Sequence, residues 1–230
     1  MRLLFLTLSN IQSIAERGIY TDLLREFRDR GHDVYIVCPS ERRFGRPTEL
    51  MSIDGVTILR VRTGNITKTG FFEKTVSTAL LEFQFISAIR RFLSNVEFDL
   101  VLYSTPPITF DRVVGHVKSR YGCQSYLLLK DITPQDLVDM EIIRKGGLIW
   151  HYLRRREKRL YALSDHIGCM SAANVAYLLK NNDEIPSCKV EECPNSISPR
   201  PVHDFERCCR PARGSYGIPD DSILLVYGGN

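Results

Sequence analysis

The chain has 230 residues, of which 43% are hydrophobic and 25% are charged. This composition excludes a disordered chain, and no apolar run reaches the roughly 18–20 residues needed to cross a bilayer. The net charge of +4 is too small to indicate nucleic acid without a clustered basic patch, so no nucleic-acid partner is predicted.

Short apolar runs alternate with helical patterns along most of the chain. The first apolar run spans only about six residues and lacks a small-residue cleavage site, so it predicts a buried strand and not a signal peptide. Strands are predicted at Leu3–Leu8, Val34–Cys38, Val56–Val61, Leu100–Tyr103, Ser125–Leu129, His166–Met170 and Lys189–Cys193. Helices are predicted at Ala15–Arg30, Phe71–Leu93, Ile108–Arg120, Gly147–Leu163 and Ala172–Lys180. This alternation predicts an α/β fold with a doubly wound, Rossmann-like parallel sheet covered on both faces.

The last part of the chain differs in composition. Five prolines between Pro194 and Pro219 indicate a linker, which we place at residues 197–221, after a sheet domain at residues 1–196. A further strand is predicted at Ser222–Tyr227, followed by a Gly-Gly turn. Because a lone strand cannot bury its faces, residues 222–230 are expected to begin a second, truncated domain.

The seven cysteines indicate a reduced chain and not a disulfide framework. Three of them lie in or beside predicted strands, where a free thiol serves as a small apolar group. Others gather near His203 in a group that resembles a metal cluster: Cys188, Cys193, Cys208 and Cys209. Their spacing fits no standard zinc pattern, so no metal site is predicted.

Ligands of an open parallel sheet bind at the carboxyl ends of its strands, so the residues after each strand are the candidates. Gly18, near the start of the first helix, would expose backbone N–H groups to an anion, and an ordinary loop with an incidental glycine is the alternative. Ser104 and Thr105 follow the fourth strand and precede a double proline. They form either a polar, functional strand end or an ordinary start of the next helix, where proline is common in the first turn.

The later strands end in further polar residues. Lys130 and Asp131 place a cation and a carboxylate together, either as a functional pair or as salt-bridge partners of other residues. Ser171 suits a helix N-cap, and Asn195 suits a turn.

One stretch, residues 144–159, holds seven basic residues and a single acid among aromatic and aliphatic side chains. That mixture suits the interface of an anionic membrane, and a packed helix with a solvated basic face is the alternative. The predicted membrane-facing residues are Lys145, Trp150, Arg154, Arg155, Arg156 and Arg159.

Several stretches together resemble the N-terminal half of family 4 glycosyltransferases, which have the two-domain GT-B fold. They are LLFLTLSNI, ERGIYTDLLREFRDRGHDVYIVCP, GNITKTG, FDLVLYSTPPITF, YLLLKDITPQ, IGCMSAANVAYLL and VEECPNSI. Within the family, the chain is most similar to bacterial transferases of O-antigen and capsule assembly, of the N-acetyl-L-fucosamine transferase type.

The resemblance implies a retaining transfer of a sugar from a nucleotide diphosphate, expected to be UDP, to a lipid-linked sugar at the inner membrane face. No cofactor or obligatory metal is implied. The first loop would reach the donor diphosphate with Arg17, Gly18, Ile19 and Tyr20. Lys130 and Asp131 would be catalytic, and the acceptor cleft would contain Tyr103, Ser104, Thr105, Ser171 and Asn195. The protein would be cytoplasmic and peripheral to the membrane.

The resemblance also implies a C-terminal domain that binds the nucleotide-sugar, and its donor motifs are absent from this sequence. Because those groups would supply most of the transition-state binding of a charged diphosphate, the chain alone is expected to be inactive or nearly so. A stand-alone acceptor-binding module that works with a separate donor-domain partner is the alternative. An unrelated nucleotide-binding regulator is disfavoured, because the sequence has no glycine-rich phosphate loop.

Overall fold

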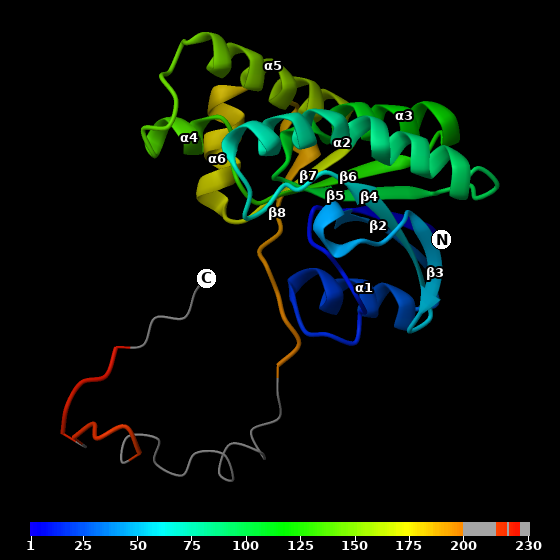
Figure 1. Cartoon of the computed structure of the whole chain (residues 1–230). Helices are drawn as coiled ribbons and strands as arrows, with labels where there is room; N and C mark the ends of the chain where they lie inside the picture. Colours follow the sequence, from blue (N-terminus) through cyan, green and yellow to red (C-terminus); the bar gives the residue numbers. More distant parts are fainter. Residues whose placement is uncertain (200–214, 220, 226–230) are drawn as a thin grey trace. The chain divides into compact units, whose positions relative to one another are not determined.

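A mostly parallel sheet forms the centre of residues 1–197 in the computed structural model, which describes residues 1–199, 215–219 and 221–225 (Figure 1). Its strand order is β3-β4-β2-β1-β5-β6-β7-β8. The strands are β1 (Arg2–Leu6), β2 (Asp33–Glu41), β3 (Glu49–Ile53), β4 (Val56–Thr63), β5 (Leu100–Ser104), β6 (Gln124–Leu129), β7 (His166–Cys169) and β8 (Val190–Glu192). The α/β fold with a doubly wound parallel sheet is therefore confirmed.

The helices lie on both faces of the sheet (Figure 1). They are α1 (Ile19–Asp29), α2 (Phe71–Phe92), α3 (Asp111–Tyr121), α4 (Gln135–Asp139), α5 (Leu148–Leu163) and α6 (Ala172–Asn181). Three short 3-10 helices join them: η1 (Arg42–Phe44), η2 (Ile108–Phe110) and η3 (Ser187–Lys189). One core lies under α2, α3, α5 and α6, and a smaller core lies under α1.

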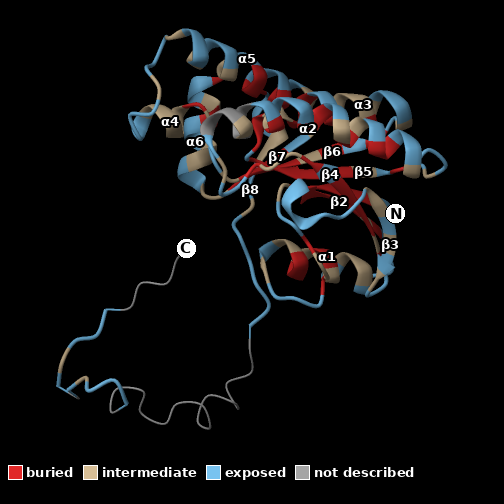
Figure 2. Ribbon diagram, in the orientation of Figure 1, coloured by how far each residue is buried: buried red, intermediate tan, exposed pale blue. Residues whose placement is uncertain are grey.

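Strand β1 shows why this sequence forms a buried central strand. Leu4 and Leu6 contribute to the larger core, whereas Leu3 and Phe5 contribute to the core under α1. Since successive side chains of a strand point to opposite faces, a continuous apolar run fills both sides at once. Figure 2 shows the buried residues concentrated along the sheet and on the inward sides of the helices.

Strand β3 was missing from the expected elements. It pairs antiparallel with β4 at the edge of the sheet through a turn at Asp54 and Gly55, whose φ angles are 55° and 77°. Two successive residues with positive φ are typical of the tight hairpin turn that an Asp-Gly pair favours. The predicted parallel sheet is thus extended by an antiparallel edge strand.

Other predicted boundaries also shift. Helix α1 begins at Ile19 and not at Ala15, because Gly18 is its N-cap and the preceding residues form a loop. Strand β2 continues through Pro39 to Glu41, and Cys193 lies just beyond β8.

The predicted strand at Ser222–Tyr227 is not seen in its described part. Residues 222–225 are not assigned to a strand, and Val226 and Tyr227 lie outside the described residues. The Ser222 N–H and hydroxyl both donate hydrogen bonds to the Pro219 carbonyl, which is a local turn contact and not a strand ladder. The linker at residues 197–221 and the second domain at residues 222–230 stay predictions.

Candidate functional site

The carboxyl edge of the sheet has a topological switch point between β1 and β5. The chain leaves β1 toward α1 on one face, whereas it leaves β5 toward α3 on the other face. Diverging connections open a crevice at such a point, which is where open α/β sheets bind ligands. At the end of β1, the buried Thr7 hydroxyl accepts a hydrogen bond from the Ser9 N–H at 3.0 Å.

Thr105 fixes the chain that follows the neighbouring strand β6. Its hydroxyl accepts a hydrogen bond from the Lys130 N–H at 3.1 Å and donates one to the Asp131 carbonyl at 3.2 Å. Thr105 and Ser104 are both buried, so they shape the edge from below and do not present their side chains to solvent.

Lys130 and Asp131 lie at the carboxyl end of β6. The Lys130 ammonium donates a hydrogen bond to Asn195 Oδ1 and so links the end of β6 to the chain after β8. Burial lowers the pKa of Lys130. Burial and the charge of Asp136 raise the pKa of Asp131. Titratable groups with pKa values displaced toward neutrality, at a strand end next to a topological switch point, are typical of functional sites.

Tyr103 does not line this edge, which corrects its expected place in the cleft. Its side chain is fully buried, and its hydroxyl lies 2.6 Å from Ser164 Oγ. The alternation along β5 places Val101 and Tyr103 together in the core under α2 and α3.

The first loop is occupied by its own side chains. The Gly18 N–H donates a hydrogen bond to Asp22 Oδ1 at 3.3 Å. Arg17 and Ile19 are exposed, whereas Tyr20 packs against Phe5 with a ring separation of 5.2 Å. In this structure, the N–H group expected to meet a diphosphate is therefore directed at a carboxylate of the same chain.

Ser171 is the N-cap of α6, as its N-cap interpretation predicts. Its hydroxyl accepts a hydrogen bond from the Asn174 N–H at 3.3 Å. This bond satisfies one of the free N–H groups at the start of the helix.

The predicted membrane-facing set divides in two. Arg156 is buried among carboxylates of other helices, and Arg154 is bound to Glu157, so these two residues do not form a free basic surface. Lys145, Arg155 and Arg159 are exposed, and Trp150 is half-buried. Exposed apolar side chains accompany them at Met140, Ile142, Leu148, Ile149 and Tyr152.

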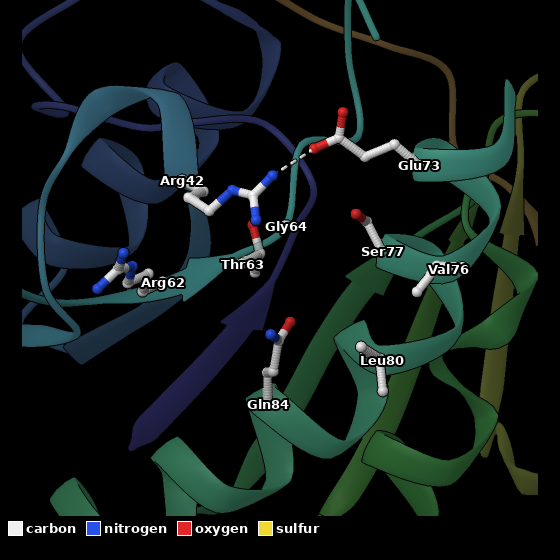
Figure 3. A pocket seen from close by; sticks show the side chains of 9 residues that line it. All are labelled: Arg42, Arg62, Thr63, Gly64, Glu73, Val76, Ser77, Leu80 and Gln84. Carbon is white, nitrogen blue, oxygen red and sulfur yellow. Dashed lines mark hydrogen bonds and ion pairs between the residues drawn. The ribbon is translucent and has the colours of Figure 1, made fainter. Parts of the chain in front are cut away.

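A pocket that the sequence did not predict lies between β4 and α2 (Figure 3). It has a volume of about 470 Å³ and is lined by Thr63, Gly64, Glu73, Ser77, Leu80 and Gln84, among others. The GNITKTG stretch begins at its base, so a polar, glycine-containing strand end was the available signal. We call it the β4–α2 pocket.

Two further features concern metals and membranes. Within the described residues, no group of three or more His, Cys, Asp or Glu side chains is placed to hold a metal ion. His203, Cys208 and Cys209 lie outside those residues. Across the described part of the chain, each helix is too short or too polar to cross a membrane.

Solved structures share this fold. The sucrose-phosphate synthase of Thermosynechococcus elongatus is 13% identical with a TM-score of 0.64, and the match covers 96% of this chain and 53% of that one. An E. coli structure described as trehalose-6-phosphate bound with UDP-2-fluoro glucose is 10% identical with a TM-score of 0.59, covering 94% and 53%. The apo UGT2 of Phytolacca americana is 12% identical with a TM-score of 0.53, covering 91% and 54%.

The chain therefore spans about half the length of these proteins. At such low identities the likeness shows the fold alone, which is that of one half of a GT-B glycosyltransferase. Among the curated proteins, none matches significantly. The family model of Glycosyltransferase Family 4 matches residues 19–200, which is most of the chain. The chain belongs to glycosyltransferase family 4.

Proposed function

We propose that this chain is the acceptor-binding part of a retaining glycosyltransferase that moves a sugar from a UDP-linked donor to a lipid-linked saccharide in surface polysaccharide synthesis, of the O-antigen or capsule type. The observation that carries the proposal is the polar group of Lys130, Asp131 and Asn195 at the carboxyl edge, beside the switch point. The family match and the E. coli neighbour bound with UDP-2-fluoro glucose support the transfer from a nucleotide-sugar.

Within this proposal the two titratable groups have different roles. The Asp131 carboxylate, which is partly desolvated at the end of β6, accepts a hydrogen bond from the acceptor hydroxyl and orients it toward the donor sugar. Lys130 stays bound to Asn195 and supplies positive charge near the developing charge of the leaving diphosphate. The raised pKa of Asp131, caused by burial and by Asp136, makes the carboxylate a better proton acceptor than an ordinary aspartate.

The donor half follows from the length of the match. Since the chain spans about half of the structures it resembles, we propose that the donor nucleotide-sugar is bound by a second domain. That domain either continues this polypeptide or belongs to a separate partner chain, in which case the present chain is a stand-alone acceptor-binding module. In both arrangements the chain alone shows little or no turnover.

Reading the coding sequence downstream of the Asn230 codon distinguishes the two arrangements. An in-frame second set of βα units supports a single two-domain enzyme. A stop codon directs the search to a neighbouring gene for the donor half.

Turnover with both halves present tests the catalytic proposal. Asp131→Asn should reduce kcat by about tenfold or more, because the amide is a far weaker proton acceptor. Asp139→Asn, an exposed aspartate on the short helix α4, serves as the matched control and should retain wild-type turnover. Wild-type kcat in Asp131→Asn would remove Asp131 from the catalytic group.

We further propose that the protein is cytoplasmic and peripheral on the inner membrane face. The exposed apolar side chains around the start of α5, together with Lys145 and Arg155, support this docking. We call these residues the α5 patch.

A further inference from the structure

A basic hollow lies on the outer surface where α2 and α3 run side by side (Figure 1). It is lined by Arg90 from α2 and by His116, Ser119 and Arg120 from α3. Arg90 and Arg120 belong to the last turns of their helices. Because α2 leads into the start of β5 and α3 into the start of β6, the hollow lies at the amino edge of the sheet. We call it the α2–α3 hollow.

The side chains of the α2–α3 hollow are accessible to a dissolved ligand. Arg90, Ser119 and Arg120 are exposed, and His116 is half-buried. The hollow has a volume of about 550 Å³, which lies within the range of roughly 300–1,000 Å³ that is usual for small-molecule sites. A small solute can therefore reach all four side chains from the solvent.

The two guanidinium groups are held in place by bonds that use only part of their donors. Arg90 Nε donates a hydrogen bond to His116 Nε2 at 3.3 Å. Arg120 donates to the Ser94 carbonyl at 3.2 Å and lies 5.5 Å from the centroid of the Tyr121 ring. A guanidinium group carries five N–H donors, so these bonds leave others for a ligand. Side chains that are fixed in advance lower the entropic cost of binding.

The charges around the α2–α3 hollow are unbalanced. Among the described residues, no carboxylate lines it. Burial and the positive charges of Arg90 and Arg120 lower the pKa of His116. A like charge disfavours the protonated imidazole, so two uncompensated cations act on this ring, one from each helix. An anion would offset this positive charge, whereas a cation would add to it.

The donors also select the kind of anion. Guanidinium groups pair best with the oxygens of carboxylates and phosphates. Two guanidinium groups, an imidazole and a hydroxyl offer more donors than the two oxygens of a carboxylate can accept. A phosphate monoester has three terminal oxygens and a charge of about −1.5 to −2 near neutral pH, so it can pair with side chains of both helices at once.

We propose that the α2–α3 hollow binds a phosphate group, carried either by a soluble phosphate ester or by a lipid headgroup. A second, apolar hollow shares Arg90 with it and is lined by Phe83 and Ile86. The Phe83 side chain is well exposed, so this neighbouring surface suits the acyl chain of a lipid-borne phosphate. Lys130 and Asp131 lie at the opposite, carboxyl edge of the sheet, so the proposal does not depend on sugar transfer.

Amide chemical shifts of the full chain, measured at neutral pH and constant ionic strength, test the site with inorganic phosphate. Phosphate should shift the resonances of residues 90, 116, 119 and 120, and acetate should shift them much less. Arg90→Gln with Arg120→Gln should weaken phosphate binding by about tenfold or more, because it removes two charged donors. Both side chains are exposed, so the Tm of this double variant should stay close to that of the unmodified chain.

Arg91→Gln is the matched control. Arg91 is exposed in the same last turn of α2 but does not line the α2–α3 hollow, so this variant should bind phosphate normally. No shift with phosphate, an equal shift with acetate, unchanged binding by the double variant, or an equal loss in Arg91→Gln would each overturn the phosphate site.

Two soluble probes distinguish the sources of the phosphate group: glycerol 3-phosphate, and dihexanoylphosphatidic acid below its micelle concentration. Tighter binding of the lipid, with additional shifts at Phe83 and Ile86, supports a lipid headgroup at the site. Equal binding of the two probes without those shifts supports a soluble phosphate ester. Binding of neither probe would overturn the proposal.

Discussion

Gly64 and Ser77 bring the end of β4 against α2 at a separation that no larger residue allows. Gly64→Ala would place a methyl group 2.8 Å from Ser77 Cβ. We expect a loss of about 1–3 kcal/mol in the free energy of unfolding, because the helix must shift to relieve the overlap. Urea unfolding measures this loss.

Gly115→Ala is the control for that change. Its added Cβ would meet only ordinary contacts with Leu163, 3.6 Å away or more, in the middle of α3. Replacing a helical glycine by alanine should stabilise the protein by roughly 0.5–1 kcal/mol. Equal stability of the two variants would contradict the close contact between Gly64 and Ser77.

Asp165, which directly precedes β7, predicts that the free energy of unfolding depends on pH. Although burial raises its pKa, hydrogen bonds from Lys118 at 2.6 Å and from the Ser125 N–H at 2.8 Å lower the pKa overall. A folded-state pKa below the unfolded value of about 3.9 stabilises the protein above that pH, and the stabilisation is lost as the pH falls through the folded pKa. The urea midpoint should therefore fall in acid, and Asp165→Asn should reduce that slope. An unchanged slope in the variant would contradict the assignment.

Single residues also show where sequence reasoning stopped. Lys130 and Asp131 were placed correctly after a strand, because the apolar run before them defines where β6 ends. Their link to Asn195 depends on the order of β6, β7 and β8, which no local pattern contains. Tyr103 was predicted in the acceptor cleft, although the alternation along β5 indicates a buried position. Val101 and Tyr103 lie on the same face of the strand, and both belong to the larger core.

Helix α5 also shows which parts of the structure could be predicted from the sequence and which could not. Its buried residues are Arg156, Glu157, Leu160 and Tyr161, which recur at helical spacing. This periodicity predicts that Arg156 faces the core. The number of basic residues in the stretch instead led to the prediction of Arg156 on the surface. The partners that compensate its charge, Glu82 on α2 and Asp111 on α3, are distant in sequence and could not have been found locally.

This buried network makes a prediction about three helices together. Arg156 pairs with Glu82 and Asp111 and donates to the Thr109 carbonyl at 3.0 Å. Arg156→Met would leave two buried carboxylates without their main cation and should cost about 3–5 kcal/mol of unfolding free energy. Arg155→Met, on the exposed side of the same helix, should change stability by less than about 0.5 kcal/mol.

The loss in Arg156→Met should also depend on pH. Burial raises the pKa of Glu82 and of Asp111, and removing the guanidinium raises both further. Groups whose folded-state pKa lies above the unfolded value destabilise the fold increasingly as the pH rises through the folded pKa. The variant should therefore lose more stability near neutral pH than at about pH 5. A pH-independent loss would show that Arg156 acts through packing alone.

For the molecule as a whole, the sheet order could be anticipated only in outline. Alternating strands and helices predict a parallel doubly wound sheet, and this prediction is confirmed. The hairpin partner β3 was missed because Glu49–Ile53 is a partly exposed edge strand with a weak apolar pattern. The Asp54-Gly55 pair was the sequence signal that could have revealed it.

The α5 patch makes a prediction about the location of the whole protein. Vesicles of phosphatidylglycerol and phosphatidylcholine should bind the chain, whereas pure phosphatidylcholine should bind it weakly. Lys145→Gln with Arg155→Gln should weaken binding by about tenfold or more, since each basic residue near an anionic surface contributes about 1 kcal/mol.

The control for that experiment removes the same charge elsewhere. Arg30→Gln with Arg46→Gln alters two exposed basic residues away from the patch and should leave vesicle binding nearly unchanged. Added salt should weaken the binding of the unmodified chain, as screening requires. Equal binding by both double variants would refute docking through the α5 patch.

The central position of β1 has a consequence for biosynthesis. Its two neighbours are β2, which follows soon after it, and β5, which pairs Leu100 with Leu3. At about 5–20 residues per second, a ribosome needs on the order of 5–20 s to progress from position 3 to position 100. During that interval the edge of β1 that later pairs with β5 has no hydrogen-bond partner, and the strand is almost wholly apolar. The newborn chain is therefore most exposed to aggregation, and most dependent on chaperones, before β5 emerges.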